Sequence, residues 1–181
     1  WQADYETDAR AITGQSEPVP FFLCQMSSHT GYGQSTPRIA GAQLSACASS
    51  TTHFLVGPKY FLTYVDAAHL TAASYRHLGE YYGKALHRVL VEGHPWTPLS
   101  PRRIRLKGSS IQIDFHVPVL PLQIDTNRVW LKSNYGFEYA DDTASASLQS
   151  VSLWGDRSIV LQLNRAPSGA NPRVRYAWTG T

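Results

Sequence analysis

The sequence has little charge, and this shortage excludes several classes of protein. Charged residues make up 16% of the 181 residues and the formal net charge is only +3, whereas a nucleic-acid-binding domain usually carries a concentrated basic face. The densest basic cluster, residues 102–107, alternates with Ile104 and Leu106, a pattern typical of an exposed strand. No apolar run is long enough to span a bilayer. We therefore expect no nucleic-acid partner and no membrane partner.

Cysteine is also scarce, since the chain contains only Cys24 and Cys47. Neither belongs to a Cys-x-x-Cys pair of the kind that zinc sites use. Cys24 lies in the apolar run VPFFLCQM and Cys47 lies near the end of an expected helix, so two buried free thiols are favoured, and a disulfide stays open. No signal peptide is visible after Trp1. Hydrophobic residues nevertheless make up 43% of the chain, which is enough for a sizeable core.

The residues before about position 95 alternate between strand-like and helix-like segments. Continuous apolar runs at 19–27 and 53–58 predict two strands that are buried on both faces. A long Gly- and Ser-rich loop and a helix at 37–49 follow the first strand, and a helix at 71–93 follows the second. This alternation predicts an α/β fold with a parallel sheet.

Both helices have recognisable start signals. The helix at 37–49 would begin after an N-cap at Thr36 and bury a face that contains Ile39. The helix at 71–93 would be capped by Thr71. Its predicted buried stripe, at spacings of three and four, consists of Tyr75, Leu78, Tyr82, Ala85 and Val89.

Two strands do not make a stable parallel sheet, so residues 1–93 are interpreted as the C-terminal portion of a larger α/β domain. A Pro-rich linker follows at 94–101. Short runs with period-two alternation, including one at 128–132, then continue to the end and are separated by turn residues. Residues 102–181 are therefore predicted to form a β-sandwich or jelly-roll-like module.

The most suggestive chemistry is the Asp66-x-x-His69 pair in the loop before the second helix. Histidine takes and returns protons near neutral pH, and a carboxylate that accepts one ring N–H fixes the tautomer that a general base needs. The ends of parallel strands are also where α/β folds place their sites. The alternative is that Asp66 caps the helix and that His69 is an ordinary surface residue.

The run VGPKYFLTYVDAAHLTAASYRHLGEYYGKAL, residues 56–86, resembles the last conserved block of the SGNH (GDSL-like) hydrolases. It is most similar to the sialate O-acetylesterase-like carbohydrate esterases, in which Asp-x-x-His-Leu-Thr precedes the final helix. The upstream PFFLCQMSSHTGYG and the tail that ends in VRYAW resemble the same family. The resemblance implies a three-layer SGNH-type domain with an accessory β-module. It also implies that His69 is the general base and Asp66 its orienting carboxylate.

The nucleophile of such a triad has no clear candidate in the chain. Two Gly-Gln-Ser triplets place Ser16 and Ser35 in expected turns, and Ser35 is the better of the two because its loop follows a strand end. A turn role is favoured for both. We therefore expect the nucleophilic serine and the oxyanion donors upstream of Trp1, in an N-terminal part of the same protein or in a separate chain. The 181 residues alone are expected to be inactive.

The resemblance implies an acetylated carbohydrate as substrate, cleavage by an acyl-serine mechanism, and no metal or organic cofactor. Three residues of the loop at 28–36, His29, Tyr32 and Ser35, could contact the sugar, and the alternative is a surface loop without function. An extracellular, periplasmic or virion-associated setting is favoured.

The alternative function is a non-catalytic carbohydrate-binding or structural module of a surface or virion protein. In that case the β-half would be the working part, with Trp130, Trp154 or Trp178 stacked on sugar rings. Tryptophan in strands is, however, often part of the core.

Overall fold

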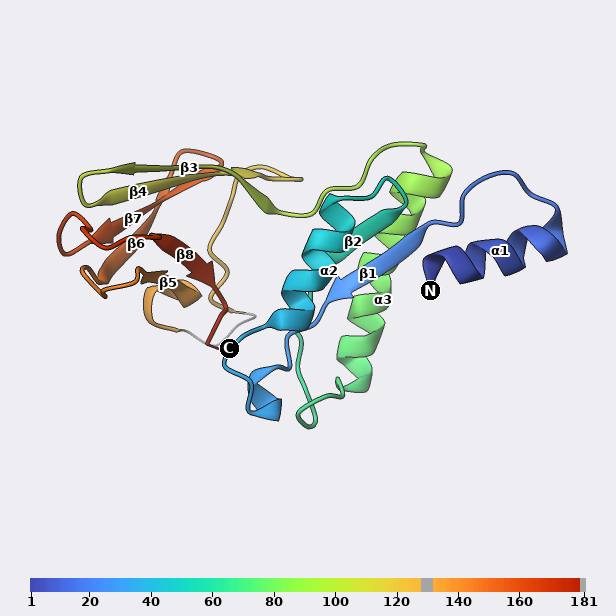
Figure 1. Cartoon of the computed structure of the whole chain (residues 1–181), viewed down its shortest axis with the longest axis horizontal. Helices are drawn as coiled ribbons and strands as arrows, with labels where there is room; N and C mark the ends of the chain where they lie inside the picture. Colours follow the sequence, from blue (N-terminus) through green and yellow to red (C-terminus); the bar gives the residue numbers. More distant parts are fainter. Residues whose placement is uncertain (128–131, 180–181) are drawn as a thin grey trace. The chain divides into compact units, whose positions relative to one another are not determined.

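The computed structural model describes residues 1–127 and 132–179 and has a mixed helix-and-sheet fold (Figure 1). The chain divides into two compact units. The first unit comprises Trp1–Ser27, Pro37–Lys59 and Thr63–Thr97, and the second comprises Ser28–Thr36, Tyr60–Leu62 and the chain from Pro98 onward. Among the helices of the described residues, none combines the length and the apolar character that crossing a membrane requires.

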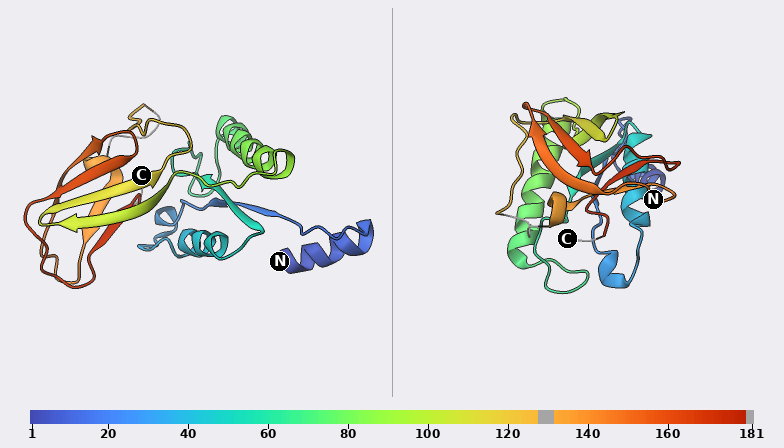
Figure 2. Two further views of the ribbon diagram at one scale, coloured as in Figure 1. Left: turned by 90° about the horizontal axis from the view of Figure 1, so that it is seen from above. Right: turned by 90° about the vertical axis from the view of Figure 1, so that its left-hand side faces the viewer.

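The first unit is built around two parallel strands, β1 (Phe21–Gln25) and β2 (His53–Pro58). Both predicted strands are confirmed. The helices α2 (Arg38–Ala48) and α3 (Ala72–Leu86) lie on opposite faces of this pair (Figure 2). The prediction that both strands are buried on both faces is wrong for β1, which is half-buried along its whole length, whereas β2 is buried at its centre.

The helix α3 begins as the sequence predicts. Thr71 is its N-cap, and the Thr71 hydroxyl accepts a hydrogen bond of 3.2 Å from the backbone N–H of Ser74. The α-helix ends at Leu86 and continues as one π-helical turn, His87–Val91. The predicted buried stripe is correct at Ala85, but Tyr75 is half-exposed and Ser74 is buried in its place.

The helix α2 turns a different face inward from the one predicted. Pro37 is the N-cap and makes no side-chain capping bond, so the prediction of Thr36 as cap is wrong. Ala40 is buried, whereas Ile39 is 61% exposed. The reason lies outside the helix. The side-chain amide of Gln25 donates to the Ala40 carbonyl at 3.1 Å, and that of Gln43 accepts from the backbone N–H of Met26 at 2.8 Å.

A third helix, α1 (Gln2–Thr13), precedes β1 and was not expected from the sequence. None of its residues is buried. Gln2 donates to the Val19 carbonyl at 3.2 Å, and the ring of Tyr5 lies 6.0 Å from that of Phe21. The helix is therefore attached to the rest of the first unit by contacts with Val19 and with the first residue of β1.

The second unit contains two antiparallel sheets. One has the order β3-β4-β7-β6 and the other pairs β5 with β8. The strands are β3 (Ser100–Lys107), β4 (Ser110–His116), β5 (Phe137–Ala140), β6 (Leu148–Trp154), β7 (Ser158–Leu163) and β8 (Arg173–Tyr176). The strand predicted at 128–132 falls largely on residues 128–131, which lie outside the described residues.

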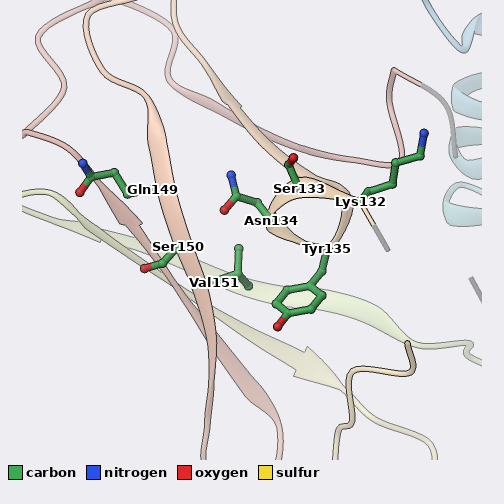
Figure 3. Close-up of a pocket in the computed structure, with 7 residues that line it drawn as sticks. All are labelled: Lys132, Ser133, Asn134, Tyr135, Gln149, Ser150 and Val151. Carbon is green, nitrogen blue, oxygen red and sulfur yellow. The ribbon is translucent and has the colours of Figure 1, made fainter. Parts of the chain in front are cut away.

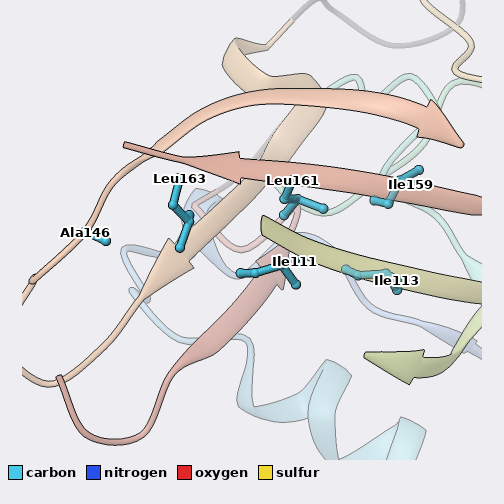
Figure 4. Close-up of a cluster of buried hydrophobic side chains, with 6 residues drawn as sticks. All are labelled: Ile111, Ile113, Ala146, Ile159, Leu161 and Leu163. Atoms are coloured by element: carbon cyan, nitrogen blue, oxygen red, sulfur yellow. The ribbon is translucent and has the colours of Figure 1, made fainter. Parts of the chain in front are cut away.

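The core of the second unit follows the period-two pattern of its strands. Its buried members are Ile111 and Ile113 of β4, Ile159, Leu161 and Leu163 of β7, and Ala146 (Figure 4). Side chains of β5, β6 and β8 pack against this cluster, so both sheets contribute to one core. The basic strand β3 is almost entirely exposed, as expected for the basic cluster at 102–107, but its alternating apolar residues Ile104 and Leu106 are also 55% and 47% exposed and do not join this core.

The two cysteines are free and half-buried. Burial raises the pKa of the Cys47 thiol.

Candidate acid-base site

Asp66 and His69 lie in a short closed loop between β2 and α3. Tyr64 and Leu70 form an isolated antiparallel bridge, and the backbone N–H of Val65 donates to the His69 carbonyl at 2.8 Å. A further backbone bond of 2.9 Å joins the Thr71 N–H to the Thr63 carbonyl. These bonds close the chain on itself around the Asp-His pair.

Two further contacts attach this loop to the first unit. The backbone N–H of Thr63 donates to the Ser74 hydroxyl at 2.9 Å, which connects the loop to the first turn of α3. The hydroxyls of Tyr64 and Ser27 lie 2.7 Å apart, which connects it to the segment after β1. Leu70 is buried. The position of the pair therefore depends on the helix cap and on both strands of the sheet.

Asp66 uses one carboxylate oxygen to hold the backbone of its own loop. Its Oδ1 accepts hydrogen bonds from the backbone N–H groups of Ala68 and His69, both at 2.7 Å, which is the geometry of an Asx turn. These hydrogen bonds lower the pKa of Asp66 from an ordinary 3.8 to about 2. The backbone N–H of His69 has the largest effect, followed by the N–H of Ala68 and then by the His69 ring. The carboxylate is therefore ionised across the physiological pH range.

The imidazole of His69 is oriented by the same carboxylate. Its Nδ1 lies 2.8 Å from Oδ2 and 3.1 Å from Oδ1 of Asp66. Because an ionised carboxylate can only accept, Nδ1 carries the hydrogen, and in the neutral ring the lone pair is on Nε2. The side chains of His69 and Asp66 are 70% and 54% exposed, so Nε2 is accessible. This arrangement can serve as an oriented general base.

The two candidate serines belong to different units, Ser16 to the first and Ser35 to the second. Among the described residues of the first unit, no serine hydroxyl is hydrogen-bonded to the His69 ring. Ser16 is exposed in the segment after α1, where its carbonyl accepts a hydrogen bond from Arg10 at 2.8 Å. Ser35 is exposed and belongs to the second unit.

The predicted substrate-contacting residues, His29, Tyr32 and Ser35, all belong to the second unit. His29 lies beside a 3-10 turn, Thr30–Tyr32, and its Nε2 is 2.8 Å from the Trp178 carbonyl. Its Nδ1 is buried and has no hydrogen-bond partner among the described residues. Tyr32 is 61% exposed. The structure thus brings Asp66 and His69 together, whereas the three loop residues are not part of the same unit.

Two features of the site were not found from the sequence. The Asx turn at Asp66 has a signal that could have been used, because Asp favours such turns through its short side chain. The bond between Ser27 and Tyr64 joins residues 37 positions apart and leaves no local signal. No group of three or more His, Cys, Asp or Glu side chains that could hold a metal ion occurs within 1–127 and 132–179.

The alternative function, a carbohydrate-binding module, depends on exposed tryptophans, and the two candidates that the structure describes have different surroundings. Trp154, at the end of β6, is 65% exposed. The Trp178 ring is contacted by the guanidinium of Arg175 at 4.7 Å from the ring centre, a cation-π geometry. Trp130 lies outside the described residues.

No protein-family model matches the sequence, and no curated protein matches it. The structure is similar to the crystal structure of a novel carbohydrate acetylesterase from Xanthomonas citri, with a TM-score of 0.59 and 21% sequence identity. The match covers 95% of this chain and 38% of that chain. At this level of identity the likeness is one of fold.

Proposed function

We propose that this chain carries the acid-base part of a serine-type carbohydrate O-acetylesterase. The observation that carries the proposal is the Asp66–His69 pair, in which Nδ1 is held by an ionised carboxylate and Nε2 remains available. The similarity in fold to a carbohydrate acetylesterase supports a hydrolase of this type. As finer parts of the proposal, residues 1–93 are the C-terminal portion of an SGNH-type domain, and residues 102–181 are an accessory β-sandwich or jelly-roll-like module.

The proposed reaction is a two-step acyl transfer. A serine hydroxyl attacks the acetyl carbonyl while His69 takes the hydroxyl proton on Nε2. The tetrahedral intermediate expels the sugar oxygen, which receives that proton from the imidazolium. Water then attacks the acetyl-serine with His69 again as base, and acetate leaves as serine recovers its proton. Asp66 stays ionised throughout and stabilises the imidazolium in both steps.

The serine and the oxyanion donors are proposed to come from a part of the protein outside these 181 residues, either in the same chain or in a companion chain. The acetylated carbohydrate is proposed to contact His29, Tyr32 and Ser35. No metal or organic cofactor takes part in any step of this scheme.

The test is acetate release from an acetylated oligosaccharide, measured with the protein that contains this chain. We expect His69→Ala to lower kcat by a factor of about 10³ or more, as for the loss of a general base. The 181-residue chain alone is expected to be inactive. Hydrolysis by this chain that is lost in Ser35→Ala would instead make Ser35 the nucleophile. Activity that survives His69→Ala would refute the proposal.

A further inference from the structure

The second unit contains a cleft that lies apart from the Asp66–His69 loop in the sequence. Its volume is about 470 Å³, and it is open to solvent. One side is the short turn Ser133–Gly136 and the other is the first half of β6 (Figure 3). The lining residues are Lys132, Ser133, Asn134, Tyr135, Gln149, Ser150 and Val151.

The backbone of the turn is unusual for its sequence. Asn134 and Tyr135 both have φ of 53°, and Gly136 follows with φ of 82°. Asparagine and glycine tolerate this left-handed conformation, but tyrosine rarely adopts it. Backbone conformations of this kind concentrate at binding and catalytic sites, where the surrounding structure maintains them.

Neighbouring strands hold the turn in place. The Asn134 amide donates to the Leu148 carbonyl at the start of β6 at 3.4 Å. The Ala177 N–H, just after β8, donates to the Gly136 carbonyl at 3.0 Å. The result is that the Tyr135 ring, 39% exposed, is presented to the cleft opposite Val151 (Figure 3).

The lining has the chemistry of a sugar-binding surface. A pyranose ring has an apolar C–H face and a rim of hydroxyls that both donate and accept. An exposed aromatic ring complements the first, and side-chain amides and hydroxyls complement the second. Within residues 1–127 and 132–179, the Gln149 amide and the hydroxyls of Ser133 and Ser150 make no hydrogen bond to protein, so they are open to a ligand.

The same lining argues against other ligands. Among the described residues that line the cleft, Lys132 alone is charged, and its side chain extends away from the other six (Figure 3). These six residues therefore offer no cation to an anion. A compact apolar molecule would need a more enclosed and more hydrophobic pocket than this one.

We propose that this cleft is a binding site for a neutral oligosaccharide, with Tyr135 stacking on a sugar ring and Gln149 and Asn134 bonding its hydroxyls. Such a site does not require ester hydrolysis. It would hold the glycan chain independently of the chemistry at His69.

The experiment is a titration of the ¹⁵N-labelled 181-residue chain with unacetylated xylohexaose, cellohexaose and mannohexaose. We expect at least one of them to shift the backbone amides of residues 133–135 and 149–151. Tyr135→Gly removes the ring but permits φ of 53°, so the turn is kept. We expect it to weaken binding by about tenfold or more, as for the loss of a central aromatic contact, and Gln149→Ala to weaken binding as well.

Trp154→Ala is the matched control, because Trp154 is an exposed aromatic residue of β6, the strand whose first half lines the cleft, and Trp154 itself does not line the cleft. It should bind as the wild type does. The proposal is overturned if none of the three saccharides shifts these amides at millimolar concentration, if binding survives Tyr135→Gly, or if the shifts follow Trp154. Because the probes carry no acetyl group, a negative result leaves the esterase proposal untouched, and inactivity as an esterase leaves this site untouched.

Discussion

Replacing Asp66 by asparagine tests the acid-base proposal more sharply than removing the side chain. The introduced amide would keep a carbonyl oxygen in the place of Oδ1, which accepts the backbone N–H groups of Ala68 and His69. The atom that faces His69 in the place of Oδ2 would become an amide nitrogen, which donates. The ring would then accept at Nδ1 and carry its hydrogen on Nε2. The loop is preserved, but the base has the wrong tautomer.

The expected loss of kcat follows from this change of tautomer and from the solvent exposure of the Asp66 side chain. The equivalent substitution in a buried triad lowers kcat by about 10⁴. The Asp66 side chain is 54% exposed, so water screens part of its electrostatic effect on the imidazolium. We therefore expect a decrease in kcat of roughly 10² to 10³ for Asp66→Asn, with KM little changed, since the pair acts on the transition state.

The assay is acetate release by the protein that contains this chain, combined with amide NMR spectra of the loop at 63–71. Asp66→Ala serves as the comparison, because it removes both oxygens and should shift the amides of Ala68 and His69 strongly, whereas Asp66→Asn should not. If Asp66→Asn keeps kcat within about threefold of wild type while His69→Ala abolishes it, the orienting role of Asp66 is wrong.

Three further predictions concern the supports of the site and of the second unit. By ¹³C NMR the Asp66 carboxyl should titrate near pH 2, and its pKa should stay below 3.8 in His69→Ala, because backbone N–H groups are the larger causes of the lowering; a wild-type midpoint of 3.8 would contradict the turn. Since folding lowers this pKa, the stability that the carboxylate contributes is present above about pH 4 and is lost toward pH 2. Gly169→Ala places a Cβ 2.5 Å from the Asp141 carboxylate and the Thr143 hydroxyl, so the free energy of unfolding in denaturant should fall by about 1–3 kcal/mol, whereas Gly79→Ala in α3 meets nothing within 4 Å and should not destabilise. Thr71→Ala should cost about 1 kcal/mol through loss of the α3 cap, and Thr71→Ser should restore it; equal thermal stability of all three proteins would exclude the cap as a support.

The sequence predicted those parts of the fold whose causes are local. The apolar run ending at Gly57-Pro58 became β2, and Thr71 caps α3 because the capping bond spans only three residues. The Asp66–His69 contact was predictable for the same reason, since both side chains belong to one turn. The period-two runs at β4 and β7 likewise became strands, and apolar residues at alternate positions of both strands are buried.

The errors occur where distant residues decide. The inward face of α2 is set by hydrogen bonds that the Gln25 side chain and the Met26 backbone N–H donate to the helix, not by the apolarity of Ile39, which remains exposed. The helix α1 has no buried residue and so leaves no apolar stripe to find. The cleft beside Tyr135 depends on a left-handed backbone that sequence patterns do not indicate at a tyrosine.

In the candidate site, Asp66 already orients His69, but the His69 side chain is exposed to solvent. The turn at Asp66 is closed by backbone donors whether or not a nucleophile is present, so the orientation of His69 does not depend on substrate. Yet the His69 side chain is 70% exposed, and a solvated imidazolium gains little from its carboxylate compared with one in a water-excluded site. On the proposed mechanism, the part of the protein that supplies the serine would therefore have to bring the serine hydroxyl to Nε2 and also exclude water from the Asp66–His69 pair. Accordingly, a loss of kcat for Asp66→Asn near the upper end of the expected range, about 10³ rather than 10², would indicate that the assembled protein covers the pair.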